Sequence, residues 1–358
     1  MKKFSSAILG ATGIIGQRYI EYLEAHPHFE ISMLCSSDKH VGKKIREIRR
    51  FYPFSETTLN MELEELDIRS LIKKNISIVF SALPIDVAKG IELELATNDI
   101  AVFSNAGAYR THKNIPVMIP EINYDHIKAI EIQRQEFKSK GFIITNPNCT
   151  TVGIVMVIKP LLDIAKIKDL YISSYQSISG AGYPGIPAYD IVNNIVPYIP
   201  AEEEKIEYEC RKILGTVDFK EGIIPKEIEI HANCARVPVH EGHLISMIIN
   251  FEREVSEDEL KNALRNFRSV PYELKLPSAP RECLKVFEEE TYPQPRYNIY
   301  EGEPERARGM TVSVGRIRVK GKTAKLFSLV NNTIRGGAGN VILCAELAVH
   351  DKFIETGV

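Results

Sequence analysis

A cysteine near the middle of the chain has the surroundings of a reactive thiol. The apolar run 142–145 is typical of a buried strand, and an Asn-Pro-Asn turn separates it from Cys149. Asn148 suits an N-cap, so we expect a helix over 150–159 that Pro160 ends. In the first turn of a helix, unpaired N–H groups and the positive end of the helix dipole stabilise a thiolate or an oxyanion. Most free cysteines are buried structural residues, but this turn and helix start favour a catalytic one.

Three polar residues further along the chain could serve such a thiol. Arg236 and His243 flank a predicted strand–turn–strand corner, where a histidine can shuttle protons and an arginine can hold a carboxylate with two parallel hydrogen bonds. Gln176 lies on a predicted strand over 170–179, just before a glycine-rich loop that could bring backbone N–H groups to the reactive centre. The alternative interpretation of that loop is an ordinary turn with several glycines. The spacing of the residues does not establish that His243 contacts Cys149.

The first strand, loop and helix have the pattern of a dinucleotide site. A strand over 4–9 runs into a G-x-x-G-x-x-G loop, a helix follows, and a second strand covers 31–35. Glycines let the backbone approach a pyrophosphate at the helix N-terminus. A glycine-rich turn without a ligand is the alternative. The residues expected at the cofactor in this loop are Gly10, Thr12, Gly13, Ile14, Ile15 and Gly16.

The end of the second strand bears on which dinucleotide binds. NAD sites usually place an acid there, whereas this strand ends in Ser36 and Ser37, followed by Asp38 and Lys39. Hydroxyls and lysines suit the 2′-phosphate of NADP better, and a solvated loop is the other reading. Asp38 leaves the preference open.

The next two strands should carry further ligands at their carboxyl ends. A strand over 76–80 ends in Ser81 and Ala82, and one over 100–103 ends in a small-residue loop that leads to Arg110. Arg110 could bind an anionic substrate group at the same edge as the glycine loop. A surface arginine is the alternative.

These elements predict an α/β chain with two domains. We expect a Rossmann-type dinucleotide-binding domain over 1–149 plus 331–358 and an α+β domain over 150–330 with a mostly antiparallel sheet. A glycine-rich segment at 331–340 would return the last helix, 341–350, to the first domain. The expected second-domain strands are 170–179, 227–237, 243–251, 310–319 and 323–330, the expected helices there are 187–196, 201–214 and 256–267, and an exposed helix is expected over 125–140.

Composition excludes several classes of protein. The chain has 358 residues and a net charge of −2, so no global field favours nucleic acid or a membrane surface. Its six cysteines form no C-x-x-C pair and no ladder, which indicates neither a disulfide framework nor a zinc or other metal site. Reduced thiols, no signal-peptide pattern and no membrane-length apolar run predict a cytoplasmic protein.

In their order along the chain, these motifs resemble aspartate-β-semialdehyde dehydrogenases of the archaeal and fungal type. The likeness covers nearly the whole chain, including the Gly10–Gly16 loop, the Asn146–Thr151 motif, and Arg236 seven residues before His243. It implies NADPH-dependent, reversible reduction of L-aspartyl 4-phosphate to aspartate semialdehyde and phosphate, through a thioester on Cys149. It also implies a role in aspartate-family amino-acid biosynthesis and a homodimer or homotetramer.

The resemblance assigns roles to individual residues. It implies that Cys149 is the nucleophile, His243 the acid and base, and Gln176 the residue that orients the acyl group. Spacing alone reads Glu202 and Lys205 as a solvated helix start, but the family match places them at the substrate amino group and phosphate. The remaining residues it implies are Arg236 at the substrate carboxylate, Arg110 at the phosphate, Asn148 at the substrate, and Ser179, Gly180, Gly182 and Asn332 at the cofactor.

Two residues differ from the family pattern, and three other functions remain as alternatives to this assignment. Glu241 stands where the family usually has Asp, and Lys39 stands where an arginine often holds the 2′-phosphate. An acyl-CoA reductase of the same superfamily, such as a malonyl-CoA reductase, shares the loop and the cysteine, but its thioester substrate has no α-amino group. A more distant rival is N-acetyl-glutamyl-phosphate reductase, and a non-catalytic NADP-sensing module is a rival from another class.

Overall fold

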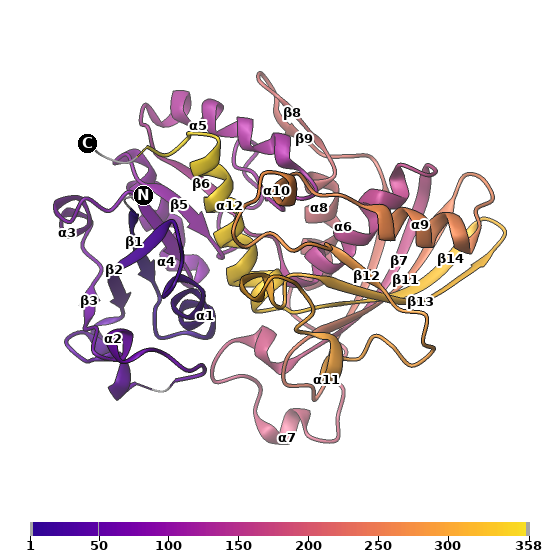
Figure 1. Cartoon of the computed structure of the whole chain (residues 1–358), viewed down its shortest axis with the longest axis horizontal. Coiled ribbons are helices and arrows are strands. Elements are labelled where there is room, and N and C mark those ends of the chain that lie inside the picture. The colour runs from indigo at the N-terminus through magenta and orange to yellow at the C-terminus, as the bar shows by residue number, and fades with distance from the viewer. Residues whose placement is uncertain (1–2, 49, 356–358) are drawn as a thin grey trace.

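Two six-stranded sheets organise the chain in the computed structural model, which describes residues 3–48 and 50–355 (Figure 1). The first sheet is parallel throughout, and its strand order is that of a doubly wound dinucleotide-binding fold. In order across the sheet, its strands are β3 (Leu63–Glu65), β2 (Phe29–Ser36), β1 (Phe4–Leu9), β4 (Ile78–Ser81), β5 (Ala101–Ser104) and β6 (Phe142–Thr145).

Helices cover both faces of this sheet because side chains alternate along each buried strand. Ile8 and Phe80 pack with α1 (Ile14–Leu23) and α12 (Gly339–His350) on one face. Ala7 and Val79 face the other way, toward α3 (Ile68–Lys73) and α4 (Ile85–Thr97). The five predicted first-domain strands are therefore confirmed, and the predicted glycine loop lies between β1 and α1.

The predicted exposed helix over 125–140 is shorter and less exposed than expected. A 3₁₀ turn over Tyr124–Lys128 leads into α5 (Ala129–Phe137), whose Gln133 is fully buried. The Gln133 side chain accepts from the backbone N–H of Ile143 at 2.8 Å and donates to its carbonyl at 3.0 Å. It thereby satisfies polar groups on the edge strand β6, a demand that the helical sequence pattern does not reveal.

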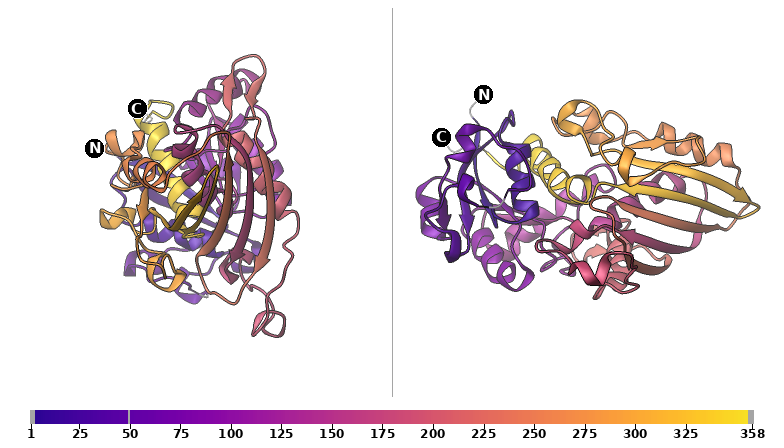
Figure 2. Two further views of the ribbon diagram at one scale, coloured as in Figure 1. Left: turned by 90° about the vertical axis from the view of Figure 1, so that its right-hand side faces the viewer. Right: turned by 90° about the horizontal axis from the view of Figure 1, so that it is seen from below.

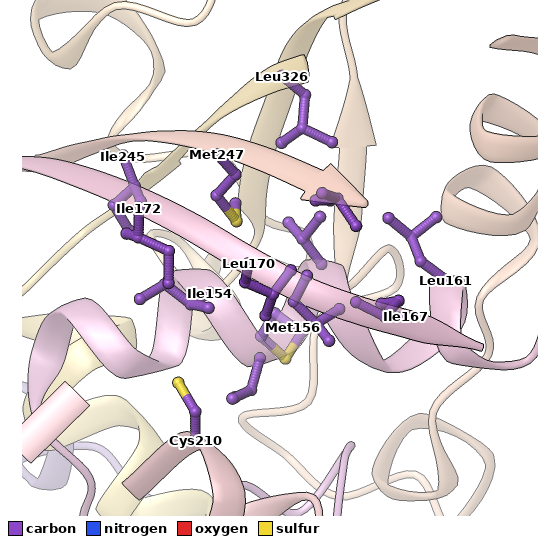
Figure 3. Packing of buried hydrophobic residues seen from close by; sticks show 14 of the residues in the cluster. Ile154, Met156, Leu161, Ile167, Leu170, Ile172, Cys210, Ile245, Met247 and Leu326 are labelled. Carbon is purple, nitrogen blue, oxygen red and sulfur yellow. The ribbon is translucent and has the colours of Figure 1, made fainter. Parts of the chain in front are cut away.

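Helix α6 (Cys149–Leu162) carries the cysteine motif and packs against the second sheet (Figure 3). The prediction that Pro160 ends this helix is wrong, because the helix continues through it to Leu162. A proline inside a helix costs about 3 kcal/mol. Each fully buried aliphatic side chain stabilises the folded state by about 1.5–3 kcal/mol. The helix has several of these, so their burial together outweighs the cost of the proline. They include Ile154, Val157, Ile158 and Leu161.

The second sheet is mixed, with three inner antiparallel pairings and a parallel pairing at each edge. This agrees with the expected mostly antiparallel sheet and confirms the fold class. In order across the sheet, its strands are β10 (Glu229–Arg236), β7 (Ile167–Gln176), β11 (His243–Phe251), β14 (Thr323–Val330), β13 (Val312–Lys320) and β12 (Leu284–Val286).

The predicted helix over 187–196 is wrong, since only α7 (Ala188–Ile191) is helical there. Asn193 adopts a left-handed conformation, Tyr189 and Ile195 are exposed, and Ile191 is the one buried residue of this stretch, which is too little apolar contact to stabilise a longer helix. The remaining elements are α2 (Glu56–Leu59), α8 (Glu202–Ile213), β8 (Thr216–Asp218), β9 (Gly222–Ile224), α9 (Glu257–Asn266), α10 (Val270–Glu273) and α11 (Pro295–Asn298).

The chain returns from the second sheet to the first at its end. After β14, an irregular turn over Ile334–Ala338 leads into α12, which lies between the two sheets (Figure 2). Arg335 in this turn forms a fully buried, two-bonded ion pair with Glu121, at 2.8 Å for each bond. The domain limits stay a prediction. Two residues from the range assigned to the second domain, Leu276 and Met310, pack into the core of the first sheet.

No helix in residues 3–48 and 50–355 is both long and apolar enough to cross a membrane. Within the same ranges, no three His, Cys, Asp or Glu side chains gather into a group that could hold a metal ion.

Candidate active site

Cys149 and His243 meet where the two sheets approach each other. Asn148 caps α6, and its Oδ1 accepts from the backbone N–H of Thr150 at 2.9 Å. The Cys149 Sγ lies 3.1 Å from Nε2 of His243, which is the first residue of β11 and is fully buried. The structure therefore makes the contact that spacing could not establish.

Strand register brings the other candidates to the same point. Gln176 ends β7 and pairs with Arg236, which ends the parallel neighbour β10. Strand β11 runs antiparallel to β7, so its first residue, His243, lies beside the end of β7. Three residues from separate parts of the chain thus share one end of the second sheet.

Helix α8 brings two carboxylates to the cysteine motif. Glu202 Oε1 accepts from Asn148 Nδ2 at 2.8 Å and from Gln176 Nε2 at 2.9 Å. Glu209 accepts from the backbone N–H of Asn148 at 2.5 Å and from Arg110 Nη1 at 3.0 Å. Sequence reasoning missed Glu209, although its place two helical turns after Glu202 puts both on one face of the helix.

The two lysines of α8 differ in their surroundings. Lys205 is partly buried, and its ammonium group makes no hydrogen bond or ion pair with any residue that the structure describes. Lys212 is buried, and its Nζ donates to the carbonyls of Arg110, His112 and Ile115 at 2.7, 2.6 and 2.9 Å. Burial lowers the pKa of Lys212 to about 7. Lys212, also missed from sequence, anchors the loop that carries Arg110.

The resting thiol and imidazole are both neutral. Removal from bulk water raises the pKa of Cys149 to about 12, and the charge of Glu202 adds to this while Arg236 opposes it. Burial and the charge of Arg236 lower the pKa of His243 to about 3. The expected thiolate at the helix start is thus corrected, because burial outweighs both the helix dipole and the backbone N–H of Thr150, which favours the thiolate.

Both arginines of the site keep an unused donor. Arg236 Nη1 donates to the Ser177 carbonyl at 2.9 Å, and Arg110 Nη2 donates to the Asn105 carbonyl at 3.1 Å. In each guanidinium the buried Nε has no acceptor among the residues that the structure describes. Buried donors without acceptors are costly, so these two groups suit the acceptor oxygens of an anionic ligand.

A cavity of about 520 Å³ joins the cysteine to the glycine loop, whose backbone has the features of a phosphate site. Gly10 has a φ of +77°, and a Cβ on Gly16 would lie 2.1 Å from the Gly10 carbonyl oxygen. Helix α1 has no side-chain cap at Gly13, so its first N–H groups are available to a phosphate. The lining is Gly13, Ile14, Ile15, Gly16, Ala82, Leu83, Pro84, Asn105, Arg110, Pro147, Asn148, Cys149, Ser179, Gly180, Ala181, Gly182, Tyr183, Asn332 and Gly336.

Several expected cofactor residues do not line this cavity. Ser36 ends β2, Ser37 and Lys39 follow it, and the Cys35 carbonyl of this strand accepts from the N–H groups of Gly10 and Ala11. The cofactor roles of these residues and of Thr12 stay predictions.

Ser81 is buried, and its hydroxyl donates to Glu92. Glu92 Oε1 accepts from Ser81 at 2.7 Å and from Ser104 at 2.6 Å. This buried glutamate, missed from sequence, ties the carboxyl ends of β4 and β5 together.

Asn332 lines the cavity while its amide joins three segments. Its Oδ1 accepts from Ser177 Oγ at 3.1 Å and from the Gly242 N–H at 2.8 Å. Its Nδ2 donates to Ser179 Oγ at 2.9 Å. The side chain expected at the cofactor thus also holds the glycine-rich loop against the start of β11.

Glu241, the departure from the family pattern, links the start of β11 to the first domain. Its carboxylate accepts from Arg18 Nη2 at 2.9 Å, from the Tyr300 hydroxyl at 2.9 Å and from the Thr333 hydroxyl. These contacts connect α1 to the segment that carries Asn332.

Comparisons with known proteins agree along the whole chain. The family model described as "Semialdehyde dehydrogenase, NAD binding domain" matches residues 6–130, and "Semialdehyde dehydrogenase, dimerisation domain" matches residues 158–335. The aspartate-semialdehyde dehydrogenase of Archaeoglobus fulgidus is 39% identical over 358 residues, which cover 98% of this chain and 100% of the relative. That of Saccharomyces cerevisiae is 36% identical, with 98% of each chain covered. The crystal structure of the Candida albicans enzyme with NADP has a TM-score of 0.88 at 35% identity and covers 99% of this chain and 100% of its own.

Proposed function

The chain belongs to the aspartate-semialdehyde dehydrogenase family, and on that premise we propose that Cys149 is the residue on which the family reaction takes place. The enzyme reduces L-aspartyl 4-phosphate with NADPH to L-aspartate 4-semialdehyde and phosphate, a step in amino-acid biosynthesis. The observation that supports this site is the thiol of Cys149, 3.1 Å from His243 at the wall of the cavity that reaches the glycine loop.

The thiol and the imidazole divide the chemistry between them. His243 takes the proton of Cys149, and the sulfur attacks the acyl carbon so that the C–O bond to phosphate breaks and a thioester forms. Bound NADPH supplies the hydride that reduces this thioester. The S–C bond of the resulting thiohemiacetal then breaks, which releases the aldehyde and restores the thiol with the proton from His243.

The polar groups around the thiol match the charges of the substrate. Arg236 binds the α-carboxylate, and its unpartnered Nε supports this role. Glu202 binds the α-ammonium, while Arg110 and Lys205 bind the phosphate. Gln176 and Asn148 hold the acyl group in line with the sulfur, and both are themselves oriented by Glu202.

Glu202 links substrate binding to activation of the thiol. Its charge raises the pKa of Cys149, so an ammonium group bound at Glu202 would offset that effect when substrate arrives. Glu202→Gln removes the negative charge and is expected to speed alkylation of the free enzyme by iodoacetamide at neutral pH roughly three- to tenfold, because more thiolate is present.

The same variant should lose most of its kcat/KM with aspartate semialdehyde, since the ammonium loses its partner. Glu204→Gln, on the exposed side of α8, is the matched control and should leave both rates unchanged. Alkylation that stays at the wild-type rate would exclude a charge effect of Glu202 on Cys149.

The cofactor is NADP. We propose that the glycine loop and Ser179, Gly180, Gly182 and Asn332 bind its phosphates and nicotinamide, and that Ser36, Ser37 and Lys39 receive the 2′-phosphate. Lys39 is exposed on the short turn after β2, where an ammonium can reach a phosphate without competing for a protein partner.

Lys39→Ala is expected to weaken NADP binding about three- to tenfold and to leave NAD binding within twofold, because only NADP carries the 2′-phosphate. Fluorescence titration with both cofactors measures this. Lys73→Ala, which removes an exposed lysine from α3, is the control. Equal losses for the two cofactors would place Lys39 away from the 2′-phosphate.

A spectrophotometric assay in the oxidative direction tests the proposed site and substrate together. Aspartate semialdehyde, phosphate and NADP should give NADPH, and the rate should depend on phosphate. Malonyl-CoA with NADPH is the control for the acyl-CoA rival, whose substrate offers no ammonium to Glu202. Turnover of malonyl-CoA without turnover of aspartate semialdehyde would overturn the proposal.

The enzyme is a homo-oligomer, since residues 158–335 match a dimerisation domain. We propose a cytoplasmic homodimer or homotetramer that does not bind nucleic acid or membranes. Tyr171, Tyr175 and Ile248 are exposed on the face of the second sheet that points away from α6, which supports assembly through that face. Sedimentation equilibrium distinguishes the two sizes.

A further inference from the structure

The second ring nitrogen of His243 lies against Ser177, and the backbone of Gly242 adds an interaction that favours the protonated ring. The backbone N–H of Ser177 lies 3.1 Å from Nδ1, and the Ser177 hydroxyl lies 3.2 Å from it. A backbone N–H can only donate, so Nδ1 accepts and the neutral ring carries its proton on Nε2. In this tautomer Nε2–H donates a hydrogen bond to the sulfur of Cys149, so Nε2 cannot accept the proton of the thiol.

A base at this position therefore needs a second hydrogen-bond arrangement. The neutral tautomer that can accept a proton at Nε2 has its own proton on Nδ1, and the imidazolium formed by the transfer also has a proton there. In both forms Nδ1–H would point at the Ser177 N–H, which is another donor. The Ser177 hydroxyl oxygen, which can accept as well as donate, relieves that conflict.

Asn332 fixes which way the Ser177 hydroxyl points. Ser177 Oγ lies 3.1 Å from Asn332 Oδ1 and 3.1 Å from Ser179 Oγ. The Gly242 N–H donates to Asn332 Oδ1 at 2.8 Å, so this atom of the amide must be the oxygen, which can only accept. The single hydroxyl proton of Ser177 is thus directed to Asn332, so the Ser179 hydroxyl donates to one lone pair of Ser177 Oγ and the other lone pair remains for Nδ1–H.

We propose that Ser177 is a positioning residue for proton transfer: its hydroxyl accepts the Nδ1–H of His243 while Nε2 holds the proton taken from Cys149, and Asn332 keeps the hydroxyl in that orientation. This rests on the proposed roles of Cys149 and His243. One proton moves from sulfur to Nε2 and later returns, and the proton on Nδ1 stays on nitrogen. No proton is passed to Ser177.

A neutral hydroxyl suits this position better than a carboxylate. A carboxylate would hold a proton on Nδ1 permanently, whereas a hydroxyl serves both tautomers and adds no charge. The charged group that acts on His243 is Arg236 at the end of β10, and the titratable group in contact is Cys149 at the start of α6. Glu202 of α8 and Arg110 act on that thiol.

Ser177→Ala tests the proposal through the pH dependence of Cys149 alkylation by iodoacetamide, measured without cofactor or substrate. At neutral pH the variant should react roughly ten- to a hundredfold more slowly, because the imidazolium that accompanies the thiolate loses its acceptor. At alkaline pH hydroxide forms the thiolate directly, so the two rates should converge. The kcat/KM profile should change in the same direction, with NADP affinity unchanged.

Two further variants keep the test decisive if Ser177→Ala folds poorly. Ser177→Thr retains the hydroxyl and should restore the wild-type profile, and Asn332→Ala, which frees the hydroxyl, should slow alkylation at neutral pH only. Ser328→Ala is the matched control, because this buried serine donates to the Gly153 carbonyl at 3.0 Å and does not contact His243. Its profile should match that of the wild type.

Superimposable profiles for Ser177→Ala and wild type would overturn the proposal, as would an equal loss at every pH, which marks a purely structural residue. These outcomes differ from failure of the proposed function itself. If Cys149→Ala retained activity, the site assignment would fall whatever the Ser177 variants do.

Discussion

Cys149→Ala is expected to lower kcat by at least about 10⁴-fold, because no other group can form the thioester through which the reaction divides into two easier steps. NADP binding should stay within twofold of wild type, since Cys149 touches the reacting end of the cavity and the cofactor is held by the glycine loop. Stopped assays with high enzyme concentration measure the residual rate, and fluorescence titration measures the cofactor affinity.

Cys283→Ala provides the matched control for that experiment. This cysteine is buried beside β12, away from the cavity, and its replacement removes the same sulfur. We expect full activity and some loss of thermal stability. Residual activity of Cys149→Ala within tenfold of wild type would exclude covalent catalysis at this position.

Arg236→Lys should have the second largest effect, a loss of about 1.5–3 kcal/mol in transition-state binding, or roughly ten- to more than a hundredfold in kcat/KM. Lysine keeps the charge but loses the planar fork that fits a carboxylate. It also loses the 2.9 Å hydrogen bond from Nη1 to the Ser177 carbonyl, so both kcat and KM should change. Steady-state kinetics with aspartate semialdehyde measure this.

Arg253→Lys, at the exposed end of the second domain, is the control and should be kinetically silent. NADP affinity of Arg236→Lys should be unchanged. Unaltered substrate kinetics would refute a carboxylate role for Arg236. Collapse of NADP affinity alone would place this arginine at the nucleotide and reopen the acyl-CoA alternative.

Burial makes the Cys149 thiol harder to ionise than its place at a helix start suggests. A thiol at a helix N-terminus suggests a ready thiolate, yet the structure surrounds Cys149 with protein and places Glu202 nearby, so its pKa rises to about 12. Activation therefore depends on what the substrate brings and on how His243 accepts the proton. Neither dependence can be inferred from a spacing pattern, because both arise from side chains of other elements.

Errors in the predicted elements have the same origin. The prediction that Pro160 ends its helix is wrong because burial of α6 against the second sheet outweighs the one hydrogen bond that proline removes. The prediction of a helix over 187–196 is wrong because this stretch buries only Ile191, and a single helical turn forms there. Local signals report backbone preference, and tertiary packing decides whether that preference prevails.

Local sequence patterns predicted the glycine turn at Gly10–Gly16, the Asn148 cap that starts the cysteine helix, and the strands that carry Gln176 and Arg236, although β7 ends at Gln176 and not at residue 179. These depend on neighbours within a few residues, so short-range rules suffice. Only the tertiary structure decided that Cys149 lies 3.1 Å from His243, 94 residues away, and that Glu209, Lys212 and Ser177 support the site. The reason is that such contacts follow from strand register and from the close packing of α6 and α8, which join residues that no local pattern relates.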